Sequence, residues 1–278
     1  MKLKSMLSPV QPMTEAEAKS YMDANPTGSY QLVDVRQPGE YQENHLPGAT
    51  LLPLSVLTEG GGELDPEMPT IVYCRSGGRS QAAAQYLAGS GFNNVYDIGS
   101  NIASWLGIQV AGAYELNLNL VNPDAEFADV WKIAYAMEEG LQRFYLVLEE
   151  KESREDYKQL FKRLAGFEDI HKDRLQKGYD LDESTTGDLA TFLADNPDLV
   201  EAGDLTQASP VGIISQLTNL IDIFSLGMAI EAHSLDLYTR FSNQATRPET
   251  KKLFRDLADE EKEHLGYLAK EMDKYLAS

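Results

Sequence analysis

The sequence predicts a two-domain protein, in which an α/β domain with a mainly parallel sheet precedes an all-α four-helix bundle. Up to about residue 112, short buried strands alternate with helices, a pattern typical of a parallel sheet covered by helices. From residue 125 almost to the end, apolar residues recur with the helical period. The length of 278 residues also favours two domains. We place the α/β domain at residues 1–113, a linker at 114–124 and the bundle at 125–278.

The charge balance limits the partners that we expect. The chain has 24 Lys+Arg against 44 Asp+Glu, for a net charge of −20, which repels nucleic-acid phosphates and anionic lipid. No apolar signal segment follows the first residues, and the most apolar stretch, Val211–Ile230, contains polar side chains. We therefore expect a cytoplasmic protein that binds neither nucleic acid nor membrane.

The first domain shows strands and helices in turn. Helices are predicted at Thr14–Ala24 and Ser80–Ala88, and buried strands at Tyr30–Val35 and Thr70–Cys74. The glycine-rich run Thr58–Glu63 predicts a surface loop.

The single cysteine of the chain excludes an internal disulfide and any cysteine-only metal cluster. Cys74 ends a predicted strand, and a loop with two glycines leads from it into a helix. Backbone N–H groups and the positive helix end then point into this loop, which makes it a cradle for an anion. Together with Arg75 and Arg79, this environment lowers the pKa of a thiol, so Cys74 is a candidate nucleophile.

This loop and three further motifs resemble the rhodanese family of sulfurtransferases over about residues 10–113. The motifs are Val33-Asp-Val-Arg-Gln-Pro-Gly-Glu-Tyr, His45-Leu-Pro-Gly-Ala and Asp97-Ile-Gly-Ser, which Trp105 follows. The resemblance implies that Cys74 takes sulfur from a donor such as thiosulfate and passes it, as a persulfide, to a thiol acceptor. Phosphatases of related architecture have five residues between cysteine and arginine, whereas Cys74 and Arg79 have four between them, which favours sulfur chemistry.

The resemblance also implies roles for the neighbours of Cys74. Arg79 is expected to act with Cys74 in catalysis, while Asp34 and Arg36, with Glu40, are expected to support the fold through ion pairs. The substrate-binding loop is expected to comprise Arg75, Ser76, Gly77, Gly78 and Ser80.

The second domain contains an internal repeat with an offset of 93 residues. Each copy has a Glu and a Tyr on one helical stripe and a Glu-x-x-His on the next, with matching apolar neighbours. The repeated set is Glu138, Tyr145, Glu168 and His171 in the first copy, and Glu231, Tyr238, Glu261 and His264 in the second.

These polar side chains lie on the helix stripes that should face the core. Four carboxylates and two imidazoles would be costly there without partners, and a dinuclear metal centre would balance their charge. The predicted ligands are Glu138, Glu168, His171, Glu231, Glu261 and His264. Carboxylate and imidazole ligands suit two iron ions, with manganese or zinc as substitutes. We expect Glu139, Glu260 and Glu263 to face outward.

The ligand pattern resembles the ferritin-like di-iron superfamily, and the helices are most similar to rubrerythrins. The resemblance implies oxidase or peroxidase activity, an external electron donor and a homo-oligomer, such as a dimer. Two departures weaken the implication of peroxidase activity. Rubrerythrins usually carry a further Glu where this chain has Ser234, and they often carry a four-cysteine iron site that one cysteine cannot form.

The sequence thus supports two hypotheses of different classes. The first is an enzyme, a sulfurtransferase that forms a persulfide on Cys74 and is fused to a di-iron domain. The second is a non-catalytic iron-binding or sulfur-carrying interaction protein.

Overall fold

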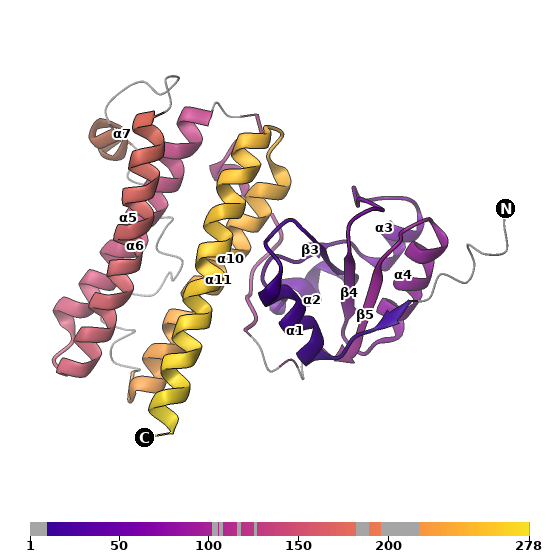
Figure 1. The fold of residues 1–278 in the computed structure, drawn as a ribbon, viewed down its shortest axis with the longest axis horizontal. Coiled ribbons are helices and arrows are strands. Elements are labelled where there is room, and N and C mark those ends of the chain that lie inside the picture. Colours follow the sequence, from indigo (N-terminus) through magenta and orange to yellow (C-terminus); the bar gives the residue numbers. More distant parts are fainter. Residues whose placement is uncertain are drawn as a thin grey trace. The chain divides into compact units, whose positions relative to one another are not determined.

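The computed structural model describes residues 10–101, 105, 108–115, 118–124, 127–181, 189–195 and 217–277. The chain forms two compact units, Met1–Asn117 with Ser234–Arg240, and Leu118–His233 with Phe241–Ser278. The first unit is an α/β domain with a parallel sheet and the second is helical (Figure 1), which confirms the predicted fold class.

A five-stranded parallel sheet forms the centre of the first unit, with strand order β1-β5-β4-β2-β3. The strands are β1 (Gln11–Pro12), β2 (Gln31–Asp34), β3 (Thr50–Leu51), β4 (Thr70–Cys74) and β5 (Val95–Asn101). The two predicted strands are confirmed as β2 and β4. Because parallel strands end at the same edge, the residues that follow β4 and β5 come together there.

Helices cover both faces of this sheet. They are α1 (Glu15–Ala24), α2 (Pro38–Glu43), α3 (Leu54–Thr58) and α4 (Gly78–Gly89). Side chains of a strand point alternately to opposite faces, so Val72 packs with α3 and α4, whereas Ile71 packs with α1 and α2. Burial on both faces explains why β4 has no polar alternation.

Local sequence signals set the helix ends. Thr14 and Glu17 form a capping box at the start of α1, so this helix begins at Glu15, one residue after the predicted start at Thr14. The second predicted helix begins at Gly78, two residues earlier than expected. The cysteine loop, which follows Cys74 and leads into this helix, is therefore shorter than the sequence indicated.

The helical unit contains four long helices, α5 (Phe127–Lys151), α6 (Glu155–Leu181), α10 (Leu220–Gln244) and α11 (Pro248–Leu276). A 3-10 helix, η3 (Leu118–Leu120), lies in the predicted linker. Helix α6 continues through Leu181. Between it and α10 the structure describes one short helix, α7 (Leu189–Asp195), whereas residues 182–188 and 196–216 lie outside the described residues.

All four long helices contribute to one apolar core. Phe144, Phe161, Phe224 and Leu268, from α5, α6, α10 and α11 in turn, belong to a single buried cluster. Each helix therefore buries one stripe, as the helical period of the sequence predicts. Among the described residues, every helix is too short or too polar to cross a bilayer.

The burial of side chains in this core predicts that two apolar residues of α6 contribute very differently to the free energy of unfolding. Phe161 is fully buried, whereas Ile170 is 65% exposed. We expect Phe161→Ala to lower the free energy of unfolding by about 3–5 kcal/mol, since it leaves a cavity in the core. Chemical denaturation followed by circular dichroism measures this loss, and Ile170→Ala is the control with little effect. Equal losses in the two variants would contradict this arrangement of the core.

Candidate functional site

Cys74 is the last residue of β4, at the carboxyl edge of the sheet, and its side chain is buried. The next residues turn sharply into α4, and Gly77 adopts the left-handed conformation with φ of 89°. A Cβ atom at Gly77 would lie 2.6 Å from the carbonyl oxygen of Gly99. Glycine is thus required there by both conformation and space.

This turn directs hydrogen-bond donors at the sulfur. The Gly77 N–H donates to Cys74 Sγ at 3.1 Å, and Ser80 Oγ lies 3.5 Å from the sulfur. Burial alone would raise the pKa of Cys74, but hydrogen bonds from Ser80 and from the backbone N–H groups of Ser76 and Gly77 outweigh it, so the pKa is lowered. The loop therefore favours a thiolate through hydrogen bonds.

The two arginines of the loop differ in their surroundings. Arg75 is exposed, whereas Arg79 forms a bidentate ion pair with Glu40 of α2, with nitrogen–oxygen distances of 2.6 and 2.8 Å. This hydrogen-bonded pair lowers the pKa of Glu40 to about 2. Because Glu40 offsets the charge of Arg79, this arginine contributes less positive potential to the sulfur than its sequence position suggests.

Asp34, the last residue of β2, forms a second ion pair with Arg36, and both side chains are buried. The guanidinium of Arg36 donates to the Asp34 carboxylate at 2.7–3.0 Å and to the carbonyl oxygen of Asn44 at 2.5 Å. Its hydrogen bonds thus join the end of β2 to the residue that follows α2. This geometry suits the supporting role that the sequence suggests for Asp34 and Arg36.

The six predicted metal ligands lie in two groups on the four long helices. In each group, one ligand atom from every residue lies within 4.8 Å of the others. The groups are Glu138, Glu168 and His171, from α5 and α6, and Glu231, Glu261 and His264, from α10 and α11.

Contacts across the bundle join the two groups. The rings of His171 and His264 stack at 4.8 Å between centroids. The Tyr145 hydroxyl on α5 donates to Glu231 Oε1 on α10 at 3.1 Å. His171 Nδ1 lies 4.0 Å from Glu261 on α11. The two groups therefore form one polar centre inside the bundle.

Several buried ligand atoms in this centre lack hydrogen bonds. Among the described residues, no hydrogen-bond donor is paired with either carboxylate oxygen of Glu168 or of Glu261. Each of these carboxylates has an imidazole nitrogen of its own helix nearby, at 3.4 Å and 3.5 Å. Burial, with the repulsion of neighbouring carboxylates, raises the pKa of Glu168 and Glu261 well above the usual range. Orphaned oxygens next to imidazoles form a donor set that fits a pair of metal cations.

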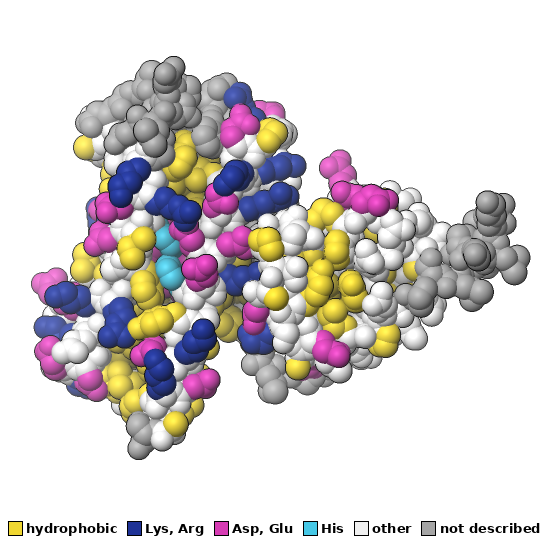
Figure 2. All heavy atoms as spheres, in the orientation of Figure 1, with side chains coloured by type: hydrophobic (Ala, Val, Ile, Leu, Met, Phe, Trp, Pro, Cys, Tyr) yellow, Lys and Arg dark blue, Asp and Glu magenta, His cyan; other side chains and the backbone are white. Residues whose placement is uncertain are grey.

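The imidazoles of the centre differ in exposure. Burial lowers the pKa of His171, but the carboxylates of Glu138 and Glu168 outweigh it and raise that pKa to about 10. His171 is 2% exposed and His264 is 15% exposed, and histidine atoms are visible on the surface of the helical unit (Figure 2). The centre is therefore close to solvent on the side of His264.

The structure corrects one expectation about this centre, because Glu260 does not face outward. Its carboxylate lies 3.3 Å from His171 Nε2 and forms an ion pair with Arg174, and its side chain is 17% exposed. The repeat offset assigns Phe167 to the equivalent position, and its ring stacks on His264 at 4.3 Å. The sequence held a signal for this difference, because the repeat places a Glu at position 260 where the first copy has a Phe at position 167. Glu263 is exposed as expected, and Glu139 pairs with Arg143 and Lys172.

Comparisons with known proteins identify two families in the chain. Residues 14–107 match a family model described as a rhodanese-like domain, and residues 108–179 and 213–277 match one described as rubrerythrin. The thiosulfate sulfurtransferase GlpE of Pseudomonas entomophila is 40% identical over 74 residues, which cover 27% of this chain and 68% of that protein. The thiosulfate sulfurtransferase GlpE of Pseudomonas syringae pv. syringae is 38% identical over 74 residues, covering 27% and 70%.

Among solved structures, a rhodanese-like domain protein from Staphylococcus aureus is 23% identical, with a TM-score of 0.31. The match covers 34% of this chain and 91% of that one.

The loop geometry predicts how the charge state of Cys74 depends on Ser80. Replacing Ser80 with alanine removes a hydrogen bond that stabilises the thiolate, so we expect Ser80→Ala to raise the pKa of Cys74 by about one unit. The midpoint of thiolate absorbance, measured against Cys74→Ser as a blank, should move to higher pH. Ser90→Ala, at the exposed far end of α4, is the matched control. An unchanged midpoint in Ser80→Ala would mean that the backbone N–H groups set this pKa alone.

Proposed function

Because the chain belongs to the rhodanese family through its first domain and carries a rubrerythrin domain after it, we propose that it is a sulfurtransferase forming a persulfide on Cys74. The observation that carries this proposal is the environment of the sulfur. Cys74 ends a parallel strand, accepts a hydrogen bond from Gly77 and has a lowered pKa. This environment favours the thiolate, which is the nucleophilic form of cysteine.

Thiosulfate is the simplest donor for this reaction. The Cys74 thiolate attacks the outer sulfur of thiosulfate, and a bond forms between Sγ and that sulfur. The bond between the two sulfurs of thiosulfate breaks, and its electron pair leaves with sulfite. Thiolate and thiosulfate dianion thus become persulfide anion and sulfite dianion, with no external oxidant or reductant.

The residues around Cys74 support this step. The exposed Arg75 attracts the dianionic donor, and Arg79, oriented by Glu40, lies at the start of α4. The outer sulfur of the persulfide extends about 2 Å beyond Sγ. The N–H groups of the loop are available to hold its negative charge. A thiophilic acceptor then removes this sulfur, and cyanide or a thiol is suitable for the assay.

We propose further that the helical unit binds two iron ions. The six side chains of the polar centre would hold them, and bound iron would supply redox chemistry with dioxygen or hydrogen peroxide. The Tyr145 hydroxyl donates to Glu231, and the Glu260 carboxylate lies 3.3 Å from the outer nitrogen of His171, where it is placed to orient that imidazole. Electrons would come from an external donor, and we propose that the protein acts as a homodimer.

Ser234 favours a second candidate function, since it occupies the position at which rubrerythrins usually have a further Glu. In that case the helical unit binds iron, and the first unit carries sulfur, without turnover. The two functions differ in one measurement. A binding protein takes up iron in a fixed ratio, whereas an enzyme also consumes many equivalents of hydrogen peroxide or sulfur donor.

The sulfurtransferase proposal predicts that the rate of sulfur transfer depends entirely on the sulfur atom of Cys74. We expect the wild-type chain to transfer sulfur from thiosulfate to cyanide, and Cys74→Ser to reduce the rate to background, because the chain has no other thiol. Thiocyanate formation measures the rate. Thermal denaturation of the variant serves as the control for folding. Equal rates in the two proteins would refute the proposal.

The metal proposal predicts opposite effects on metal content and stability. Glu261→Gln keeps the shape of a buried side chain but removes its charge, so the metal-free variant should be at least as stable as the metal-free wild type. Its iron content should nevertheless fall well below the value of about two ions per chain expected for wild type. Metal analysis and thermal denaturation measure the two effects.

Glu263→Gln is the matched control for this experiment, because Glu263 is exposed on the same helix. We expect it to keep the iron content of wild type. Full iron content in Glu261→Gln would contradict the assignment of Glu261 as a ligand.

A further inference from the structure

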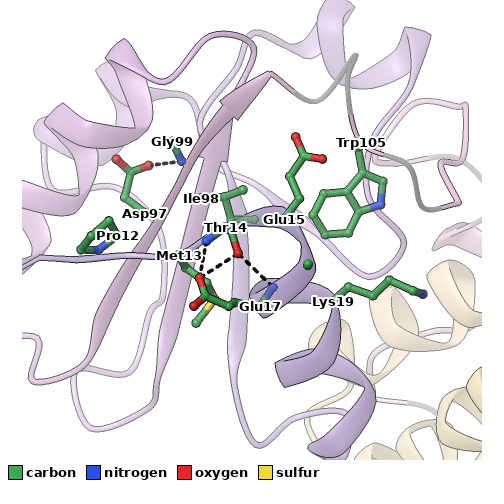
Figure 3. Close-up of a pocket in the computed structure, with 11 residues that line it drawn as sticks. Pro12, Met13, Thr14, Glu15, Glu17, Lys19, Asp97, Ile98, Gly99 and Trp105 are labelled. Atoms are coloured by element: carbon green, nitrogen blue, oxygen red, sulfur yellow. Dashed lines mark hydrogen bonds between the residues drawn. The ribbon is translucent and has the colours of Figure 1, made fainter.

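A large cavity opens beside the carboxyl edge of the sheet, between the ends of β1 and β5 and the start of α1. Its volume is about 1020 Å³, comparable to pockets that hold small organic ligands. Most of the exposed area inside is apolar. Pro12, Met13, Ala16, Ile98 and Trp105 supply the apolar side chains, and Figure 3 shows the indole of Trp105 beside Glu15.

This cavity adjoins the loop that holds the reactive sulfur. Gly99 lines the cavity, and its carbonyl oxygen packs against Gly77, whose N–H donates to Cys74 Sγ. The strand that ends at Cys74 also pairs with β5 along its length. A molecule seated in the cavity therefore lies next to the loop from which a persulfide sulfur would be transferred.

The charges around the cavity differ from those around the loop. Glu15, Glu17 and Asp97 line the cavity, with Lys19 as the single cation among its lining residues. The hydrogen bond that the Thr14 backbone N–H donates to Glu17 lowers the pKa of this carboxyl. The cysteine loop, in contrast, carries the exposed Arg75, while the charge of Arg79 is offset by Glu40. A dianion such as thiosulfate is thus attracted to the loop and repelled from the cavity.

We propose that the cavity binds the apolar, uncharged body of the thiol that accepts sulfur from Cys74. The proposal rests on the proposed sulfurtransferase activity, and it adds the chemical class of the acceptor. The flat face of Trp105 and the side chains of Met13 and Ile98 suit an aromatic ring. A carboxylate-bearing thiol is disfavoured by the acidic residues around the opening.

The transfer step balances without a further reactant. The acceptor thiolate attacks the outer sulfur of the Cys74 persulfide, and a new sulfur–sulfur bond forms between them. The bond from Sγ to the outer sulfur breaks, and its electron pair returns to Sγ as the Cys74 thiolate. One thiolate and one persulfide thus exchange roles, and no net oxidation occurs.

The first experiment compares two neutral thiols as acceptors, phenylmethanethiol and 2-mercaptoethanol. We expect kcat/KM per thiolate to be at least about tenfold higher for phenylmethanethiol, because only its ring buries apolar area in the cavity. Ala16→Trp should abolish this preference, since Ala16 is exposed on α1 and a larger side chain there fills the cavity without disturbing the core. Gln85→Trp, exposed on α4, is the matched control and should keep the preference.

The second experiment measures binding without sulfur transfer. Phenylmethanol has no thiol, and it is titrated into the full chain carrying Cys74→Ser. We expect saturable shifts in the methyl resonances of Met13 and Ile98, and their loss when Ala16→Trp is added to this variant.

The outcomes separate the two proposals. Equal kcat/KM values for the two thiols, with no saturable methyl shifts and with normal transfer to cyanide, would overturn the acceptor site alone. Absence of transfer to cyanide and to both thiols would instead overturn the sulfurtransferase, whatever the methyl resonances show. A preference for phenylmethanethiol that Ala16→Trp leaves unchanged would place the acceptor elsewhere and also overturn the acceptor site.

Discussion

Four glutamate side chains lie within the apolar core of the helical unit, where an unpaired ionised carboxylate costs several kcal/mol. Packing of leucine and phenylalanine around them cannot offset this cost, so the unit needs either bound protons or bound cations at its centre. Two of the carboxyl groups, Glu168 and Glu261, have raised pKa values, so bound protons are one way to remove their charge. Metal cations provide the other solution, and their binding would then be linked to the stability of the whole bundle.

The α/β unit favours the anionic form of a buried thiol by a different means. Its charge resides on one sulfur, and the stabilising groups are the N–H dipoles of a tight turn and the hydroxyl of Ser80. Such dipoles need no bound ion, but they need a tight turn, and the close approach of Gly77 to Gly99 leaves no space for a side chain at Gly77. The two units thus show the two ways in which proteins place negative charge away from water, by oriented dipoles and by countercharge.

The features that the sequence predicts well are local or repeated. An apolar run that ends at Cys74 marks a strand and its loop, and the offset of 93 residues places six polar side chains on the core stripes of four helices. The features that it misses depend on how distant segments meet. The position of Glu260 depends on the rotation of α11 against α6, and the pairing of Arg79 with Glu40 depends on where α2 lies. The two-residue strand β1 has no periodic signal and exists only because β5 lies beside it.

The two copies of the repeat in the bundle have the same types of ligand, but the residues next to their imidazoles differ. A carboxylate, Glu260, stands at the outer nitrogen of His171, whereas an aromatic ring, Phe167, covers His264. A carboxylate in that position makes an imidazole a more electron-donating ligand, and a ring does not. Two ions held by chemically identical ligand sets would therefore differ in redox potential. A pair in which one ion is oxidised, or in which two different metals are bound, would have a preferred order rather than a statistical mixture.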